Sequence, residues 1–109
     1  MLEPHQAPQP LPAELGNAAQ QLGKATGAQS VILFGSFARG DARKDSDVDL
    51  LYITTDDADL LSIAARAERS LWPRQISIDL VPMRQSHWLN KSSPLARRAA
   101  QEGVLLYSK

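Results

Sequence analysis

The feature that most constrains this chain is a short apolar run that ends in Gly-Ser and is followed by a second apolar run. Residues 31–34 read Val-Ile-Leu-Phe and stop abruptly at Gly35 and Ser36. A polar loop follows, and the chain becomes apolar again over residues 48–53. β-Branched, aromatic and aliphatic runs bounded by glycine and polar clusters are typical of strands. The pattern therefore predicts a strand, a turn and a second strand.

Asp47 and Asp49 lie two positions apart at the start of the second run. Because side chains alternate between the faces of a strand, both carboxylates face one side, with α-carbons about 6 to 7 Å apart. Two ionised carboxylates on one face repel each other, and a hard divalent cation such as Mg²⁺ relieves that repulsion. A polar loop in front of an ordinary strand remains the alternative. A calcium loop is excluded, because such a loop needs glycine where Leu50 stands.

The Gly35-Ser36 turn favours a phosphate site beside these carboxylates. Glycine has no bulk to keep a ligand away, so backbone N–H groups and the Ser36 hydroxyl could approach a phosphate closely. An ordinary turn is the alternative when Gly-Ser is taken alone. Together with Asp47 and Asp49, the turn predicts a metal site and a phosphate site side by side.

Composition limits the classes of function. A chain of 109 residues is expected to form one domain, burying about two-thirds of the surface of its unfolded state. Lys plus Arg equals Asp plus Glu at 12 each, so no basic field for DNA or RNA is expected. The absence of cysteine excludes disulfides and zinc thiolates and agrees with a cytoplasmic location.

The chain is expected to divide into an arm and a domain. Residues 1–12 contain four prolines and no apolar segment, so they indicate neither a signal peptide nor a membrane span, and we expect a flexible arm. Residues 13–109 form the predicted domain. Periodicity and capping signals predict further elements in it. These are a helix ending at Gly27, a helix capped by residues 55–57 and stopped by Pro73, a strand over 76–81, helices over 84–90 and 93–103, and a strand over 104–107.

The strand over residues 76–81 alternates between apolar and other residues, and Asp79 is its exception. An ionised carboxylate in a half-buried strand is costly without a partner. If this strand pairs beside the strand that carries Asp49, with matching faces, three carboxylates converge. The overall expectation is an α/β fold with a small mixed sheet of about four strands. Helices would lie mainly on one face, and the opposite face would be open around the carboxylates.

The motif spacing resembles a known signature. Gly35-Ser36, ten intervening residues and Asp47-Val48-Asp49-Leu50 resemble the signature of the DNA polymerase β-like nucleotidyltransferase superfamily. The fuller strings 35–40 and 46–50 look like its smallest branch, the minimal nucleotidyltransferases (MNT), and residues 94–107 are similar to the tail of that branch. The resemblance covers about residues 13–107. It implies the polymerase β-like fold and transfer of a nucleoside monophosphate from a triphosphate.

The resemblance also implies roles for single residues. Asp47 and Asp49 would bridge two Mg²⁺ ions, and Asp79 would be the third metal ligand and could accept the proton of the acceptor. The candidates for binding the triphosphate of ATP are Gly35, Ser36, Arg39 and Ser46.

The acceptor is expected to come from a partner, because one small domain leaves no room for an acceptor-binding domain. The MNT resemblance implies an antitoxin that transfers AMP to a tyrosine of a HEPN-domain ribonuclease toxin, within a hetero-oligomer. Two alternatives stay open. The protein could neutralise its toxin by occlusion without catalysis, or it could modify a small molecule such as an aminoglycoside together with a separate subunit.

Overall fold

A computed structural model describes residues 13–43, 45–73 and 76–109. The arm predicted over residues 1–12 lies outside the described residues. The elements are α1 (Ala13–Thr26), β1 (Ser30–Phe34), α2 (Ser36–Arg39), β2 (Val48–Thr54), α3 (Leu60–Ser70), β3 (Ile78–Arg84), α4 (Gln85–Asn90), α5 (Pro94–Glu102) and β4 (Val104–Ser108).

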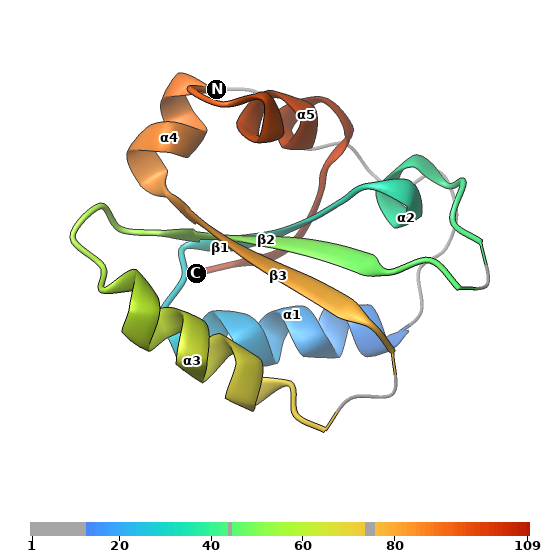
Figure 1. The fold of residues 1–109 in the computed structure, drawn as a ribbon, viewed down its shortest axis with the longest axis horizontal. Helices are drawn as coiled ribbons and strands as arrows, with labels where there is room; N and C mark the ends of the chain where they lie inside the picture. Colours follow the sequence, from blue (N-terminus) through green and yellow to red (C-terminus); the bar gives the residue numbers. More distant parts are fainter. Residues whose placement is uncertain (1–12, 44, 74–75) are drawn as a thin grey trace.

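The strands form one mixed sheet in the order β3-β2-β1-β4 (Figure 1). β1 runs antiparallel to both of its neighbours, whereas β2 and β3 are parallel and are connected by α3. The expected α/β fold with four strands in a mixed sheet is confirmed. No helix in the described ranges is long and apolar enough to cross a membrane.

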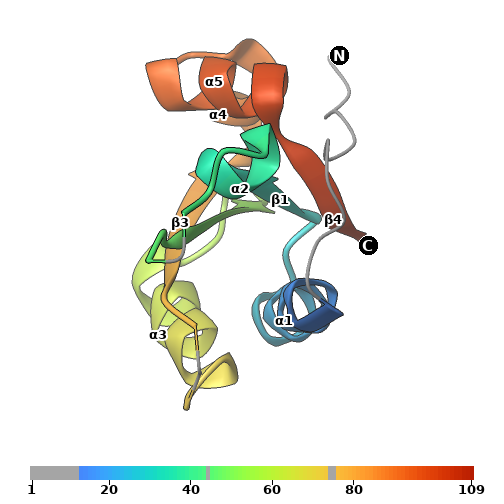
Figure 2. The same ribbon diagram turned by 90° about the vertical axis from the view of Figure 1, so that its right-hand side faces the viewer.

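Helices cover both faces of the sheet (Figure 2). The two longest, α1 with 14 residues and α3 with 11, share one face, as expected. The shorter α4 and α5 cover part of the other face, which was expected to be more open. The reason lies in β2, whose residues 50–53 are all apolar and therefore present apolar side chains to both faces.

The face under α1 and α3 is a continuous apolar core. Leu15 and Leu22 of α1 are fully buried there, together with Leu50 and Tyr52 of β2, and Ile63 of α3 joins them. Burying one such side chain contributes roughly 1.5 to 3 kcal/mol to stability. This layer fixes the strands that carry the candidate site.

The opposite core is smaller and is built on small residues. Leu51 and Ile53 of β2 pack with Trp88 of α4 and with the alanine face of α5. The predicted start of α5 is confirmed, because the Ser93 Oγ accepts the N–H of Ala96 at 3.1 Å. This core ends before the sheet does, which leaves the start of β2 and β3 uncovered by these helices.

The predicted cap of α3 is wrong. Residues 55–57 were expected to cap this helix, but α3 begins at Leu60 and its cap is Asp59, whose carboxylate accepts the N–H of Ser62 at 3.4 Å. The Asp56 carboxylate accepts the N–H of Ser86 at 2.9 Å. It therefore holds the start of α4, which sequence patterns could not indicate because the two residues are far apart in the chain.

Candidate active site

Two of the predicted carboxylates lie side by side on neighbouring strands. Asp49 of β2 is in register with Asp79 of β3, and adjacent strands are about 4.8 Å apart. Leu51 and Ile53, two and four positions after Asp49, face α4 and α5, so Asp49 lies on that face too. The conditional prediction that the strand of Asp79 pairs beside the strand of Asp49 with matching faces is confirmed.

Asp47 lies just before the first residue of β2, and its side chain is exposed. The pKa of the Asp49 carboxyl is raised above its usual range, first by burial and then by repulsion from Asp79 and Asp47. Arg39 acts in the opposite direction. This end of the sheet therefore concentrates negative charge that a cation would neutralise.

The donor set fits a hard divalent metal. Carboxylate oxygens are the ligands that Mg²⁺ prefers, and the mutual repulsion at Asp49 is what a bound cation would relieve. Within the described residues, no group of three or more His, Cys, Asp or Glu side chains stands in metal-binding geometry. The carboxylates of Asp47, Asp49 and Asp79 are thus neighbours without forming a closed ligand group.

Gly35 brings the turn after β1 against Asp49. Its backbone has φ 79° and ψ −154°, a combination essentially reserved for glycine. A β-carbon at Gly35 would also collide with a carboxylate oxygen of Asp49. The turn and the Asp49 carboxylate are therefore in direct contact, and the glycine is required by both conformation and space.

The turn contains a short helix that sequence patterns do not reveal. The single turn of α2 spans four residues, too few for an apolar periodicity. The Ser36 carbonyl accepts the N–H groups of Gly40 at 3.0 Å and Asp41 at 3.1 Å. Gly40, with φ 85°, ends the helix in the left-handed region, so this glycine permits the turn of the backbone.

A fourth carboxylate, which the sequence analysis missed, reaches this turn. The Glu102 Oε1 accepts the N–H of Gly35 at 3.0 Å, and Arg39 Nη1 donates to the two Glu102 oxygens at 3.2 and 3.3 Å. Arg39 Nε also pairs with Asp41 at 3.2 Å. The pKa of Arg39 is raised by Asp41 and Glu102. Gly35 and Arg39, both candidates for binding the triphosphate, thus contact carboxylates in this structure.

Ser46 closes the loop before β2. Its Oγ accepts the N–H of Arg43 at 2.7 Å, and its own N–H donates to the Arg43 carbonyl at 3.0 Å. These bonds give Ser46 a structural role in the loop. Its predicted contact with phosphate stays a prediction.

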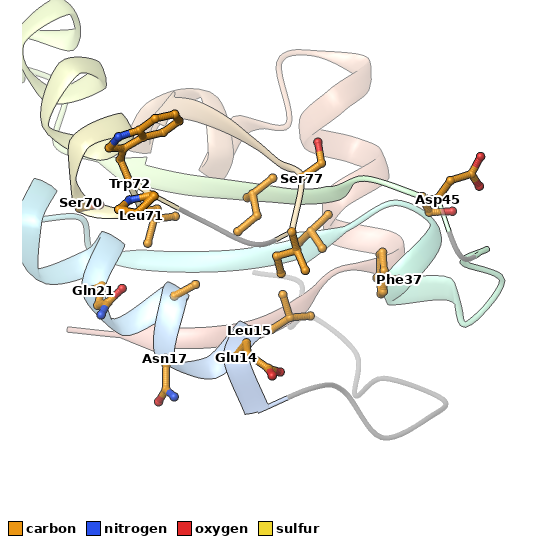
Figure 3. Close-up of a pocket in the computed structure, with 16 residues that line it drawn as sticks. Glu14, Leu15, Asn17, Gln21, Phe37, Asp45, Ser70, Leu71, Trp72 and Ser77 are labelled. Carbon is orange, nitrogen blue, oxygen red and sulfur yellow. The ribbon is translucent and has the colours of Figure 1, made fainter.

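A groove of about 880 Å³ lies at the same end of the sheet, on the α1 and α3 side (Figure 3). Phe37, Leu71 and Trp72 line it, and Asp45 lies at one end. Trp72 is 77% exposed. Asp47, Asp49 and Asp79 do not line this groove. The groove and the paired carboxylates are therefore separate surfaces.

Comparison with known proteins decides the family. The family model described as a nucleotidyltransferase domain matches residues 14–105. The chain belongs to this nucleotidyltransferase family. The superfamily prediction made from the Gly-Ser and Asp-x-Asp motif is confirmed. The predicted class of enzyme, a nucleotidyltransferase, is confirmed as well. No sequence among the curated proteins matches the chain significantly.

Solved structures share the fold of this nucleotidyltransferase domain. A toxin–antitoxin with AMP-PNP is similar with TM-score 0.63 and 23% identity, over 86% of this chain and 73% of the other. A mutant of the toxin–antitoxin MntA–HpeT has TM-score 0.62 and 19% identity, over 86% and 73%. A putative nucleotidyltransferase from Sulfolobus solfataricus has TM-score 0.62 and 16% identity, over 87% and 78%. These likenesses agree with the MNT resemblance at the level of fold.

Proposed function

We propose that this nucleotidyltransferase transfers AMP from ATP to a hydroxyl of a partner protein, a tyrosine of a HEPN-domain toxin, and so acts as an antitoxin. The observation that carries the proposal is the register of Asp49 with Asp79 beside the Gly35 turn. This arrangement supports a triphosphate held next to a carboxylate-bound metal. The remaining steps follow from the chemistry of the residues at that end of the sheet.

Asp47, Asp49 and Asp79 would hold two Mg²⁺ ions. When bound, such ions stabilise the charge that develops on the attacking and leaving oxygens of a phosphoryl group. The pKa of Asp49 is raised first by burial and then by repulsion from Asp79 and Asp47, and a cation bound at that place would offset both effects.

The transfer forms one bond and breaks another. The acceptor oxygen attacks the α-phosphorus of ATP, the bond between the α-phosphorus and the bridging oxygen breaks, and pyrophosphate leaves. The Asp79 carboxylate takes the hydroxyl proton, because its exposed position on the edge strand β3 is accessible to an acceptor. The Ser36 hydroxyl and the turn backbone would bind the β- and γ-phosphates.

The toxin partner is supported by the character of the fold neighbours. One is a toxin–antitoxin with AMP-PNP, and another is an MntA–HpeT mutant with two Asp-to-Glu substitutions two positions apart. Asp47 and Asp49 have the same spacing. The exposed position of Asp79 suits an acceptor that arrives on another protein.

Label transfer from α-phosphate-labelled ATP tests the proposal. The protein, its co-expressed partner and Mg²⁺ are incubated together, with Asp79→Ala as the site variant and Gln101→Ala, an exposed residue of α5, as the matched control. We expect label on a tyrosine of the partner with wild type and Gln101→Ala, and none with Asp79→Ala. A stable, neutralising complex that never carries label would contradict the proposal and favour occlusion.

A further inference from the structure

Glu102 joins two parts of the chain that are distant in sequence. It is the last residue of α5, and its carboxylate accepts from the Gly35 N–H at 3.0 Å and from Arg39 Nη1 at 3.2 and 3.3 Å. The Glu102 side chain is 18% exposed, and Gly35 is buried. A buried backbone N–H needs an acceptor. Glu102 supplies that acceptor from 67 residues away.

The position of Glu102 is electrostatically unfavourable without these partners. An acidic side chain at the last residue of a helix opposes the negative end of the helix dipole. Glu102 also adds to the repulsion that raises the pKa of Asp49. The ion pair with Arg39 and the bond from Gly35 offset both effects, because hydrogen bonds to charged groups are stronger than neutral ones.

Glu102 is fixed relative to β1 by its neighbour in the chain. The Gly103 N–H donates to the Ala99 carbonyl at 2.8 Å, and a β-carbon at Gly103 would collide with that carbonyl. Val104, the next residue, is already paired with Leu33 of β1. The backbone at Glu102 is therefore held just beyond the end of β1, where the Gly35 turn begins.

We propose that Glu102 is a positioning residue for the phosphate side of the nucleotide site. Its carboxylate holds the Gly35 turn against Asp49 and fixes Arg39 at the same turn, where α5 lies over α2 (Figure 2). A residue in an unusual backbone conformation persists because its surroundings fix it, and Glu102 is such a contact. The inference about nucleotide affinity rests on the proposed function. The inference about the turn does not.

The test compares three variants of Glu102 with a control. Glu102→Ala removes both contacts, Glu102→Asp keeps the charge but shortens the reach, and Glu102→Gln keeps an oxygen acceptor for Gly35 but weakens the pairing with Arg39. Gln101→Ala, the preceding exposed residue, is the matched control. Two quantities are measured: amide hydrogen exchange of Gly35 in the nucleotide-free protein, and the KM for ATP at saturating partner.

We expect Glu102→Ala and Glu102→Asp to speed exchange of the Gly35 amide by about tenfold and to raise the KM for ATP by a similar factor, as loss of a hydrogen bond to a charged group implies. The KM for the partner should not change. Glu102→Gln should keep the Gly35 protection and raise the KM for ATP by roughly threefold or less. Rescue by Gln distinguishes positioning from a general loss of stability. If Glu102→Ala fails to fold, Glu102→Asp makes the same comparison.

Two results would overturn the inference. Unchanged Gly35 exchange in Glu102→Ala and Glu102→Asp would show that the carboxylate does not hold the turn. A lower KM for ATP in both variants and in Glu102→Gln would show that the carboxylate competes with phosphate. If wild type transfers no label, the proposed function fails, and the exchange of the Gly35 amide alone still decides whether Glu102 positions the turn.

Discussion

The two faces of the sheet differ in what their side chains do, although the same strands supply both. The face toward α1 and α3 carries a continuous apolar core, with Leu50 and Tyr52 of β2 fully buried. The face toward α4 and α5 begins with Asp49 and becomes apolar at Leu51 and Ile53. Stability and chemistry are thus separated by the alternation of β2, and substitutions on the two faces should have different consequences.

The largest expected effect is loss of activity at the charged end. Asp49→Asn keeps the size of the side chain but removes the charge of a proposed metal ligand. We expect label transfer to fall by about 10³-fold or more, the scale for lost electrostatic stabilisation of a transition state. The protein should remain folded, as judged by circular dichroism. Transfer within tenfold of wild type would show that the paired carboxylates are not the metal site.

The next effect is loss of stability on the apolar face. Leu50 is one position from Asp49 but fully buried on the other side. Leu50→Ala should lower the free energy of unfolding by about 2 to 5 kcal/mol, from lost burial and the cavity left behind. At urea concentrations below the midpoint of its unfolding transition, Leu50→Ala should retain label transfer. Urea denaturation measures the free energy of unfolding, and a loss below about 1 kcal/mol in Leu50→Ala would contradict the full burial of Leu50.

Substitution of Gly35 should reduce both stability and nucleotide binding. A Gly35→Ala substitution places a β-carbon against Asp49 in a backbone region that other residues avoid. We expect a loss of about 1 to 3 kcal/mol in stability together with reduced nucleotide affinity. Gly16→Ala is the control, because a β-carbon there meets no atom within 4 Å. Similar changes in stability and nucleotide affinity in Gly35→Ala and Gly16→Ala would show that the Gly35 turn has no special role in either property.

A smaller effect is expected at the cap of α3. The Asp59 carboxylate accepts the N–H of Ser62 at the exposed start of α3. Asp59 is not one of the proposed site residues. Asp59→Ala should cost about 1 kcal/mol of stability, as lost caps do. Label transfer should be unchanged. Asp57→Ala, within the segment 55–57 where the cap was wrongly expected, should cost less stability than Asp59→Ala. A larger loss in Asp57→Ala would restore the sequence-based assignment.

The smallest expected effect is a gain in stability in Asp49→Asn. The pKa of Asp49 is raised in the folded protein, so the folded state binds the proton more tightly than the unfolded state. The wild type therefore loses stability as pH rises through the window from the ordinary carboxyl pKa to the raised one. Without divalent metal at pH 7, Asn should raise the Tm by about 2 °C. A clear decrease in Tm would show that the Asp49 charge is stabilised rather than repelled.

Local patterns predicted the elements other than α2, because each of those elements has a local cause. Alternation indicated the strand of Asp79, and Ser93 with Pro94 marked the start of α5. The parallel pairing that brings Asp79 beside Asp49 was stated as a condition, since no local pattern selects a strand partner. The family resemblance singled out Asp79 as the third carboxylate, and the register of Asp49 with Asp79 satisfies the condition.

Glu102 escaped prediction for a physical reason. Its partners, Gly35 and Arg39, are 67 and 63 residues away, and the contact depends on how α5 packs. The available signal was an acidic residue at the predicted end of a helix, where the dipole disfavours it. The four residues of α2 and the Asp59 cap were missed because neither has a periodic or unique sequence mark.

Calorimetry of a non-hydrolysable ATP analogue tests most directly whether the charged end is the nucleotide site. Wild type, Asp49→Asn and Glu14→Gln are titrated with and without Mg²⁺, where Glu14 lines the groove on the other face. We predict Mg²⁺-dependent binding by wild type and Glu14→Gln, and binding weakened by at least about tenfold in Asp49→Asn. Equal Mg²⁺-dependent binding by Asp49→Asn, with loss in Glu14→Gln, would contradict the account and place the nucleotide in the groove.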